Sequence, residues 1–186
     1  FDEATLNIYD DQLIKRSNSI YKKRLTFMKS FVPVFNYHYK NISEGKENIS
    51  LEYVSQLHEK SHEELLKNSL PKDRILQHTT QGVHKDDINF LLEGQPIKKF
   101  GSQGQQKTFL VALKFAQFDF LKEQIGAPPI LLLDDAFDKL DQKRVTQIVS
   151  LVDQDDFGQI FITDTHEQRT IDALGETKSN YQIFKI

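Results

Sequence analysis

The sequence has 186 residues, with 24 lysines and arginines against 27 aspartates and glutamates, which gives a net charge of −3 at pH 7. Hydrophobic residues make up 38% of it and charged residues 27%, which is the composition of a soluble globular protein and argues against one coated in basic charge. It has no cysteine, so disulfide scaffolds, thiolate zinc sites and cysteine nucleophiles are excluded. The longest apolar run, Pro128–Leu133, is far shorter than the ~20 residues of a membrane span, and no N-terminal stretch resembles a signal peptide; we expect a cytoplasmic protein without a membrane partner.

Residues 1 to about 31 have the periodicity of a helix. Leu6, Leu13, Ile20 and Phe27 lie seven positions apart and form one apolar stripe. The opposite face carries five basic side chains, which are Lys15, Arg16, Lys22, Lys23 and Arg24. Pro33 is expected to end or bend this helix, because proline has no backbone N–H to continue the ladder.

The next forty residues give weaker patterns. Alternating aromatic residues at 35–39 weakly favour a strand, and alternation at 49–53 indicates a second one. Residues 57–70 have the pattern of a helix that stops before Pro71.

A hairpin followed by a long helix is predicted in the middle of the chain. Residues 88–93 and 96–100 read as two short strands around Gly94-Gln95. A helical pattern then runs from about Gln103 to Gln124. Its predicted buried face consists of Phe109, Ala112, Leu113, Ala116 and Phe120.

The last third of the chain alternates strands and helices. Strands are predicted at 130–133, 159–163 and 181–186, with a helix at 143–152 between the first two and a short helix before the third. Continuous apolar runs of this kind are typical of buried parallel strands. The predicted fold class is therefore α/β with a parallel sheet.

Two carboxylates follow directly after the first of these strands. Asp134 and Asp135 come after Ile130–Leu133, and ligands of open α/β sheets bind at this carboxyl edge. One carboxylate there can hold Mg²⁺ while its neighbour orients an attacking water. The alternative is that both acids simply cap the following helix, and the motif alone does not decide between the two.

The segment Ser102-Gln103-Gly104-Gln105 begins the long predicted helix. Ser102 is a good N-cap, and Gly104 would let a phosphate approach the backbone. The free N–H groups and the dipole of a helix N-terminus favour an anion there. An ordinary capped helix after a hairpin is the alternative.

Two further segments carry polar side chains near the predicted carboxyl edge. Asp138-Lys139-Leu140-Asp141 follows the two acids and, alone, reads as a solvated turn. Thr163-Asp164-Thr165-His166 ends the next strand, where a histidine can donate a hydrogen bond to a γ-phosphate.

In this order along the chain, the four segments resemble the C-terminal half of an ABC-type ATPase head. Ser102–Gln105 is similar to the ABC signature Ser-Gly-Gly-Gln, with Gln103 in place of a glycine. Ile130–Asp135 resembles its Walker B strand, Asp138–Asp141 its D-loop, and Thr165-His166 its switch histidine.

Three stretches narrow the resemblance to the RecF family, bacterial recombinational-repair ATPases related to SMC heads. These stretches are Gly82–Asp87, Phe100–Lys107 and Leu131–Asp141. The resemblance is strong over residues 82–166 and weaker over 1–81. It implies half of a P-loop head with a parallel sheet core over 79–186, and a helical arm-lobe segment with a short strand over 1–78.

The resemblance also implies a role for each matched residue. The residues it implies for ATP binding are Ser102, Gln103, Gly104, Gln105, Lys107 and Asp141. Asp134 would hold Mg²⁺, Asp135 would position the attacking water, and His166 would sense the γ-phosphate. Since aspartate is shorter than the glutamate usual at that place, Asp135 fits the slow, DNA-linked ATPase that the resemblance implies.

For the intact protein, the resemblance implies an ATP-dependent homodimer that binds DNA at single-strand/double-strand junctions. It further implies that the protein acts with RecO and RecR to assist recombinase loading, in DNA replication, repair, recombination and the SOS response.

The sequence lacks the phosphate-binding loop that this chemistry needs. No Gly-x-x-x-x-Gly-Lys-Ser/Thr occurs, and the only Gly-Lys, Gly45-Lys46, is followed by Glu47. The chain begins with Phe1 and its only methionine is Met28, so we expect a fragment of a longer chain or a processed one. The resemblance implies that the loop lies upstream of Phe1. We therefore expect the 186-residue chain alone not to hydrolyse ATP.

Two other classes of function compete with the ATPase. His58-Glu59-Lys60-Ser61-His62 matches the His-Glu-x-x-His motif of zinc hydrolases, with Glu59 as the base. Its charged neighbours argue against it, because such helices are apolar around the motif. The second alternative is a non-catalytic module in which the helix at 1–31 binds a partner, or its basic face binds DNA phosphates; we favour a solvated face.

Overall fold

The computed structural model describes residues 3–154, 157–175, 177 and 179–185. It divides the chain into two compact units. The N-terminal unit comprises residues 1–32 and 50–91, and the C-terminal unit comprises residues 33–49 and 92–186. The fold is α/β, as predicted. The predicted boundary between an arm lobe (1–78) and an ATPase head (79–186) stays a prediction.

Helix α1 (Glu3–Ile42) continues through Pro33, so the helix does not end at this residue, and the weak strand predicted at 35–39 is wrong. Phe35, Tyr39 and Ile42 are fully buried at a helical spacing. The Phe35 ring lies 4.8 Å from that of Phe109 on α4 (Gln103–Ile125), measured between ring centroids. A proline inside a helix costs about 3 kcal/mol, whereas burying one large apolar side chain contributes about 1.5–3 kcal/mol. Three such side chains outweigh the proline.

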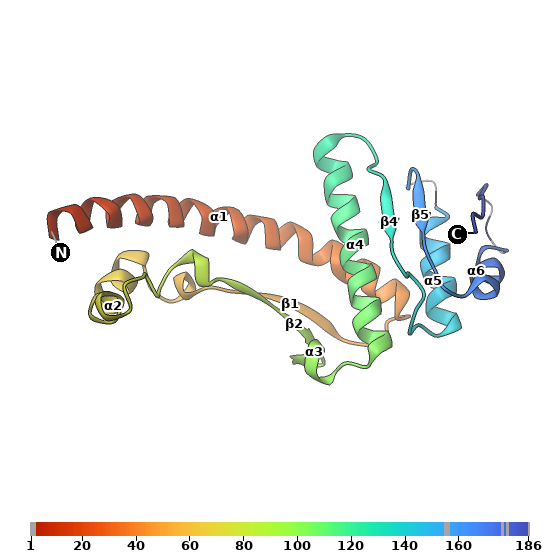
Figure 1. Ribbon diagram of the computed structural model, residues 1–186, viewed down its shortest axis with the longest axis horizontal. Coiled ribbons are helices and arrows are strands. Elements are labelled where there is room, and N and C mark those ends of the chain that lie inside the picture. The colour runs from red at the N-terminus through yellow and green to blue at the C-terminus, as the bar shows by residue number, and fades with distance from the viewer. Residues whose placement is uncertain (1–2, 155–156, 176, 178, 186) are drawn as a thin grey trace. The chain divides into compact units, whose positions relative to one another are not determined.

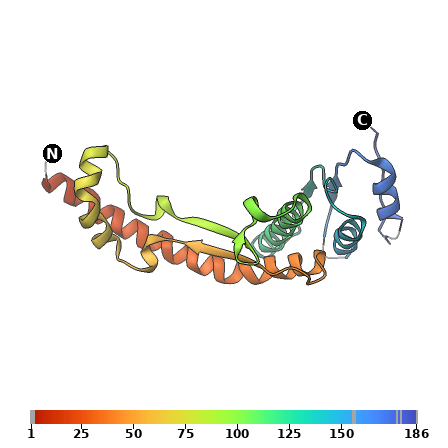
Figure 2. The same cartoon turned by 90° about the horizontal axis from the view of Figure 1, so that it is seen from below.

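The N-terminal unit packs the first part of α1 against a pair of strands and a short helix, as Figures 1 and 2 show. After α1, its elements are β1 (Ile49–Val54), a 3-10 helix (Gln56–His58), α2 (His62–Leu76), a second 3-10 helix (Val83–Lys85) and β2 (Asp87–Leu92). Strands β1, β2 and β3 (Gln95–Pro96) form a sheet in that order.

A buried carboxylate fixes α1 to the strands of this unit. The side chain of Asp86 is only 3% exposed. Its Oδ2 accepts hydrogen bonds from Arg24 Nη1 at 2.6 Å and from the Tyr53 hydroxyl at 2.5 Å. Burial and this bond to Asp86 raise the pKa of Tyr53 above its ordinary value. Arg24 therefore serves the packing of the unit and is not a member of a purely solvated basic face.

The apolar stripe of residues spaced seven positions apart on α1 is not the buried face of the helix. Leu13, Ile20 and Phe27 are exposed, while Ser17 and Met28 are buried. A straight α-helix drifts by about 20° for each seven residues, so a strict heptad stripe does not follow one face.

Helix α2 begins five residues later than predicted and contains Pro71. Its start is fixed by a capping box, in which Ser61 Oγ accepts from Glu64 N and Glu64 accepts from Ser61 N. Beyond Pro71, Asp73 accepts hydrogen bonds from Ser69 Oγ and from both the backbone and the hydroxyl of Thr80. These bonds hold the last turn in place after the proline.

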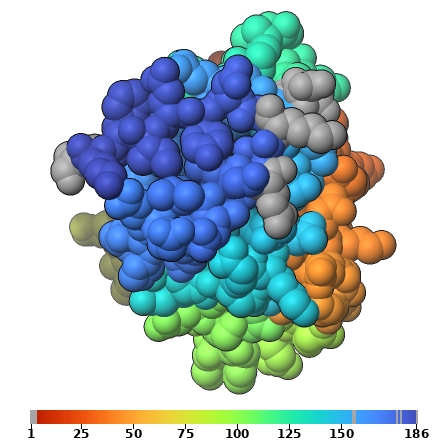
Figure 3. Space-filling model, turned by 90° about the vertical axis from the view of Figure 1, so that its right-hand side faces the viewer, coloured from red at the N-terminus to blue at the C-terminus, as the bar shows by residue number. Residues whose placement is uncertain are grey.

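The C-terminal unit contains the predicted parallel strands. Its elements after α1 are β3, α3 (Ile97–Phe100), α4, β4 (Leu131–Leu133), α5 (Gln142–Val152), β5 (Ile160–Ile162) and α6 (Glu167–Leu174). Strands β4 and β5 pair in parallel, with Leu132 opposite Phe161. Figure 1 shows α5 and α6 next to this pair of strands. Figure 3 shows the face of the molecule on which α5, α6 and the C-terminal segment lie.

Only one face of β4 is buried, which corrects the expectation of a strand buried throughout. Leu131 and Leu133 are buried, whereas Leu132 is 65% exposed and Phe161 on β5 is exposed as well. Successive side chains of a strand point to opposite faces, so the exposed pair lies on one face of this two-stranded sheet.

Helix α4 is buried over a wider arc than predicted. Phe109, Ala112 and Ala116 are buried as expected, but Leu113 and Phe120 are only half-buried. The additional buried residues are Thr108, Val111, Phe115 and Phe118. The arc is wide because Phe35 of α1 covers one side of the helix, while Phe157 stacks on Phe118 at 4.6 Å between ring centroids.

The second strand of the predicted hairpin is shorter than expected, and the predicted last strand is not found among the described residues. Residues 95–96 form β3 beside β2 after a turn at Glu93-Gly94, both with positive φ, whereas residues 97–100 form the short helix α3. Residues 181–185 form no strand, and Ile186 lies outside the described residues. No helix in the described part of the chain combines the length and the apolar character needed to cross a membrane.

Replacing Phe35 with alanine should lower the free energy of unfolding of the chain by about 3–5 kcal/mol, because it empties a fully buried ring site between α1 and α4. Urea unfolding followed by circular dichroism measures the change. The control, Tyr37→Ala, removes an exposed ring from the same helix and should cost less than about 1 kcal/mol. Equal effects of the two substitutions would contradict a core helix beyond Pro33.

Candidate functional site

The N-terminus of α4 carries the predicted signature residues in a capping box. Ser102 Oγ accepts from Gln105 N at 3.2 Å, and Gln105 Oε1 accepts from Ser102 N at 2.8 Å. Ser102 and Gln103 are exposed to solvent. The cap uses one lone pair of the hydroxyl, which still has a proton to donate to an anion.

Gly104 packs against the segment that carries Asp138–Asp141. A Cβ at this position would lie 2.9 Å from the backbone oxygen of Lys139, too close for any side chain. Lys139 itself has a positive φ of 62°. The structure thus gives a packing reason for glycine here, in addition to the expected approach of a phosphate.

The acids after β4 meet Thr163 at the carboxyl edge of the sheet. Thr163 Oγ1 donates to Asp134 Oδ1 at 2.6 Å and accepts from Asp135 N at 2.8 Å. Backbone bonds between Ala136 N and Thr163 O, and between Thr163 N and Leu133 O, hold the two strand ends together. The predicted edge is therefore assembled, and Thr163 is the residue that joins its two halves.

Asp135 has a rare backbone conformation and a buried carboxylate oxygen without a hydrogen-bond partner among the described residues. Its φ is 48°, in the left-handed region that non-glycine residues rarely adopt. Its Oδ1 is buried and has no hydrogen-bond partner among the described residues. Strain and an orphan acceptor each cost about 1–3 kcal/mol, and such features cluster at functional sites.

Lys107 of α4 reaches this edge, whereas Asp141 begins α5. Asp141 caps α5, with its Oδ1 accepting from Arg144 N at 2.9 Å, and its side chain is 63% exposed. Lys107 Nζ lies 3.5 Å from the backbone oxygen of Asp134. Asp138 pairs with the neighbouring Lys139. Asp141 is thus both a helix cap and an exposed acid next to the signature helix.

His166 is exposed and begins α6 without a side-chain cap bond. The segment that carries it is fixed by Asp164, whose side chain is 2% exposed. Arg169 Nη2 donates to both oxygens of Asp164, at 2.9 and 3.0 Å, and Thr170 Oγ1 donates to Oδ2 at 3.1 Å. Asp164 had no expected role of its own, and the structure shows that it anchors the loop.

Glu47 is the main residue that sequence reasoning missed. It lies in the loop between α1 and β1, and its carboxylate accepts from three side chains. Oε1 accepts from Gln105 Nε2 at 3.0 Å and from Arg144 Nη2 at 2.7 Å, and Oε2 accepts from the Tyr39 hydroxyl at 2.5 Å. We name Glu47, Tyr39, Gln105 and Arg144 the Glu47 cluster.

Burial and hydrogen bonding act in opposite directions on the pKa of Glu47. Burial alone would raise the pKa, but the hydrogen bonds from Tyr39, Arg144 and Gln105 outweigh it, so the pKa lies below its ordinary value. Burial and the bond to Glu47 raise the pKa of Tyr39. The pKa of Arg144 is also raised, because its pairing with Glu47 exceeds the effect of burial. The cluster is a neutral phenol beside a charged pair.

The zinc motif is not assembled. His58 ends a 3-10 helix and His62 begins α2, so the two rings do not share one helical face. His58 Nδ1 lies 2.9 Å from the Tyr21 hydroxyl and Nε2 lies 2.8 Å from the backbone oxygen of Tyr53. His62 is buried against Gly82, where a Cβ would lie 2.6 Å from its Nε2. Among the described residues, no three His, Cys, Asp or Glu side chains form a group that could hold a metal.

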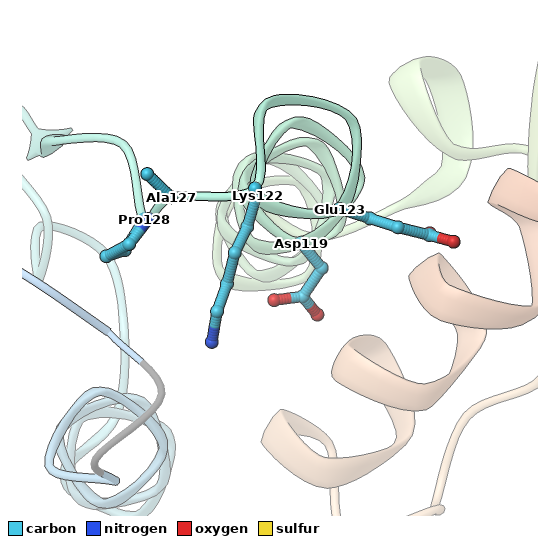
Figure 4. A pocket seen from close by; sticks show the side chains of 6 residues that line it. Asp119, Lys122, Glu123, Ala127 and Pro128 are labelled. Atoms are coloured by element: carbon cyan, nitrogen blue, oxygen red, sulfur yellow. The ribbon is translucent and has the colours of Figure 1, made fainter.

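An open pocket of about 530 Å³ lies at the C-terminal end of α4 (Figure 4). Its lining includes Asp119, Lys122 and Pro128. Asp119 Oδ2 is 2.6 Å from His38 Nε2, so this carboxylate already has a partner. A helix of this length separates the pocket from Ser102 by roughly 30 Å. The pocket is therefore separate from the signature residues.

Known proteins resemble the chain over its whole length. It is 50% identical over 186 residues to the DNA replication and repair protein RecF of Flavobacterium johnsoniae and covers 52% of that protein. It is 45% identical over 185 residues to the protein of the same name from Bacteroides thetaiotaomicron and covers 50% of it. The chain spans about half the length of the curated relatives it matches. No family model matches it.

Solved structures resemble the fold. A recombination mediator protein RecF with ATP, described within the RecFOR pathway, superimposes with a TM-score of 0.73 at 25% identity, over 90% of this chain and 46% of that one. A second structure of such a protein, RecF-ATPrS, gives a TM-score of 0.72, also at 25% identity and over 90% of this chain.

Replacing Glu47 with glutamine should flatten the acid limb of the stability curve. Because the pKa of Glu47 is lowered by folding, the folded chain binds fewer protons than the unfolded chain near this pKa. The stability that Glu47 contributes is thus present above its ordinary pKa of 4.5 and is lost as the pH falls through the lower folded-state value. Urea unfolding at several pH values below neutrality measures this slope; an unchanged slope in the variant would contradict a native ionised Glu47.

Proposed function

We propose, from its similarity to RecF DNA replication and repair proteins, that this chain belongs to their family and supplies one of the two halves of an ATP site shared between two subunits. The observation that carries the proposal is the arrangement of the C-terminal unit. The capped N-terminus of α4, the acidic edge of β4 and the exposed Asp141 all lie in that one unit. Each supplies a group that phosphate chemistry needs.

The N-terminus of α4 is the part that would bind the γ-phosphate. Ser102 offers a hydroxyl proton, and the first turn of the helix offers backbone N–H groups and the positive end of the dipole. In the proposed dimer, Ser102–Gln105 of one subunit closes over ATP held by the phosphate loop of the other. Asp141 would then lie at the seam between the subunits, and Lys107 would support the Walker B backbone.

The acids of the edge have separate roles in the proposal. Asp134 would hold Mg²⁺, which supplies charge neutralisation at the phosphates. Its Oδ1 already accepts from Thr163, which fixes the orientation of the carboxylate. Asp135, whose buried Oδ1 has no partner within the described part of the chain, would position the attacking water, and His166 would sense the γ-phosphate.

The shared site explains how ATP would control assembly. A ligand that contacts both subunits stabilises only the closed dimer, and hydrolysis removes that stabilisation. By analogy with the family, the intact dimer would bind DNA at single-strand/double-strand junctions and act with RecO and RecR in recombinase loading. The 186-residue chain, which contains no phosphate loop, would not hydrolyse ATP by itself.

The test uses the full-length parent protein with Ser102→Arg or Asp134→Ala. Ser102→Arg should abolish ATP-driven association measured by sedimentation, because a bulky cation occupies the place of the phosphate. Asp134→Ala should lower ATP hydrolysis by about 100-fold or more, since it removes the metal ligand.

The matched controls are Ser19→Arg on the exposed surface of α1 and Glu123→Gln at the far end of α4. Both should behave like the wild type. The proposal fails if the wild type binds ATP but does not associate, or if both site variants retain full hydrolysis.

A further inference from the structure

We infer that Glu47 is a positioning residue that fixes the N-terminus of α4 to the N-terminus of α5, so that Ser102 and Asp141 are presented to ATP as one rigid surface. The inference rests on the proposed function, because it assigns this surface to the nucleotide. Glu47 lies outside the four segments that carry the resemblance, and its role comes from its contacts alone.

A single carboxylate oxygen joins the two helices. Oε1 of Glu47 accepts from Gln105 in the first turn of α4 and from Arg144 in the first turn of α5, at 3.0 and 2.7 Å. Because both donors share one acceptor atom, the two helix starts cannot move apart without lengthening at least one of these bonds. Tyr39 of α1 holds the second oxygen and so fixes the carboxylate itself.

Both donors are bound to the residues that would face the nucleotide. Gln105 is the capping partner of Ser102, and the cap of α5 links Asp141 to Arg144 N. Each contact runs from Glu47 through one side chain to one proposed ATP-binding residue. Glu47 itself would touch neither ATP nor metal.

A second set of contacts closes a ring around the same joint. Arg144 Nη1 donates to Thr108 Oγ1 at 2.7 Å, and Thr108 Oγ1 donates to the backbone oxygen of Gly104 at 2.8 Å. Gly104 in turn packs on the backbone oxygen of Lys139. Two sets of contacts therefore join α5 to the signature segment, one through Glu47 and one through Thr108, and Arg144 takes part in both. The packing of Gly104 adds the D-loop segment to the second set.

Burial makes this joint depend on charge. The side chains of Glu47 and Arg144 are 13% and 18% exposed, so solvent screens their attraction weakly. A glutamine at position 47 keeps the size and one carbonyl acceptor but loses the charge that makes the bond to arginine strong. This substitution therefore loosens the joint without emptying the site.

The experiment compares full-length parent protein carrying Glu47→Gln with the wild type and with Glu44→Gln. Glu44 is the matched control, because it lies in the same loop but is exposed and pairs with Lys46. The thermal midpoint of unfolding is measured together with three functional quantities: ATP affinity at protein concentrations that keep the protein monomeric, ATP-driven association, and hydrogen exchange of backbone amides at 102–108 and 141–147.

In Glu47→Gln, ATP affinity of the monomer should stay within about twofold of the wild type. Association should weaken by about tenfold or more, and amides at both helix starts should exchange several-fold faster. Glu44→Gln should match the wild type in all three. A merely structural role would lower the thermal midpoint and leave association unchanged, and this outcome would overturn the inference.

Tyr39→Phe provides a second variant should Glu47→Gln fold poorly. It removes one hydroxyl that holds the carboxylate, and it should shift association and exchange in the same direction by a smaller factor. If wild-type protein does not associate with ATP, the proposed function is wrong. Hydrogen exchange then decides the inference by itself: faster exchange at both helix starts in Glu47→Gln supports the joint, and unchanged exchange refutes it.

Discussion

The carboxylate of Glu47 is the interaction on which the arrangement of the C-terminal unit depends. Burial of this carboxylate is unfavourable, but hydrogen bonds from Tyr39, Arg144 and Gln105 outweigh that cost and hold the pKa of Glu47 below its ordinary value. A buried ion pair of this kind adds little over an apolar replacement, but losing one member leaves the other charged and unpaired, at about 3–5 kcal/mol. Such a pair fixes which segments meet. Here the segments are the end of α1 and the starts of α4 and α5, brought together through Tyr39, Gln105 and Arg144.

The carboxyl edge of β4 and β5 is organised by a different device. The hydroxyl of Thr163 bonds to both acids: it donates to a side-chain oxygen of Asp134 and accepts from the backbone N–H of Asp135. The turn that follows carries its strain at Asp135, whose backbone is left-handed and whose buried oxygen has no partner among the residues described. The next loop is held by Asp164 and Arg169, because Arg169 Nη2 donates to both carboxylate oxygens of Asp164. Polar groups that would act on phosphate are thus held by neighbours that would not touch it, the arrangement expected of a preorganised site.

Much of this could be predicted from the sequence, for local reasons. Helix α4 has a strong cap, a long apolar period and a glycine at its end, and β4 is an apolar run between a breaker and two acids. The errors have tertiary causes. Aromatic packing carries α1 through Pro33, and the second strand of the hairpin ends at Pro96, after which residues 97–100 form a short helix with Ile97 buried. The Glu47 cluster lay beyond prediction because its bonds join residues 58 and 97 positions apart, and one glutamate in a polar loop gives no local signal.

The most direct test of this account is the coupling energy between Glu47 and Arg144. Urea unfolding of the wild type, Glu47→Ala, Arg144→Ala and the double variant forms a double-mutant cycle that isolates the pair from its other contacts. We expect each single substitution to be strongly destabilising, the double variant to cost much less than their sum, and a coupling of about 2 kcal/mol or more. Additive effects, with a coupling below about 0.5 kcal/mol, would show that the two helix starts are held together by something other than this pair and would contradict the account.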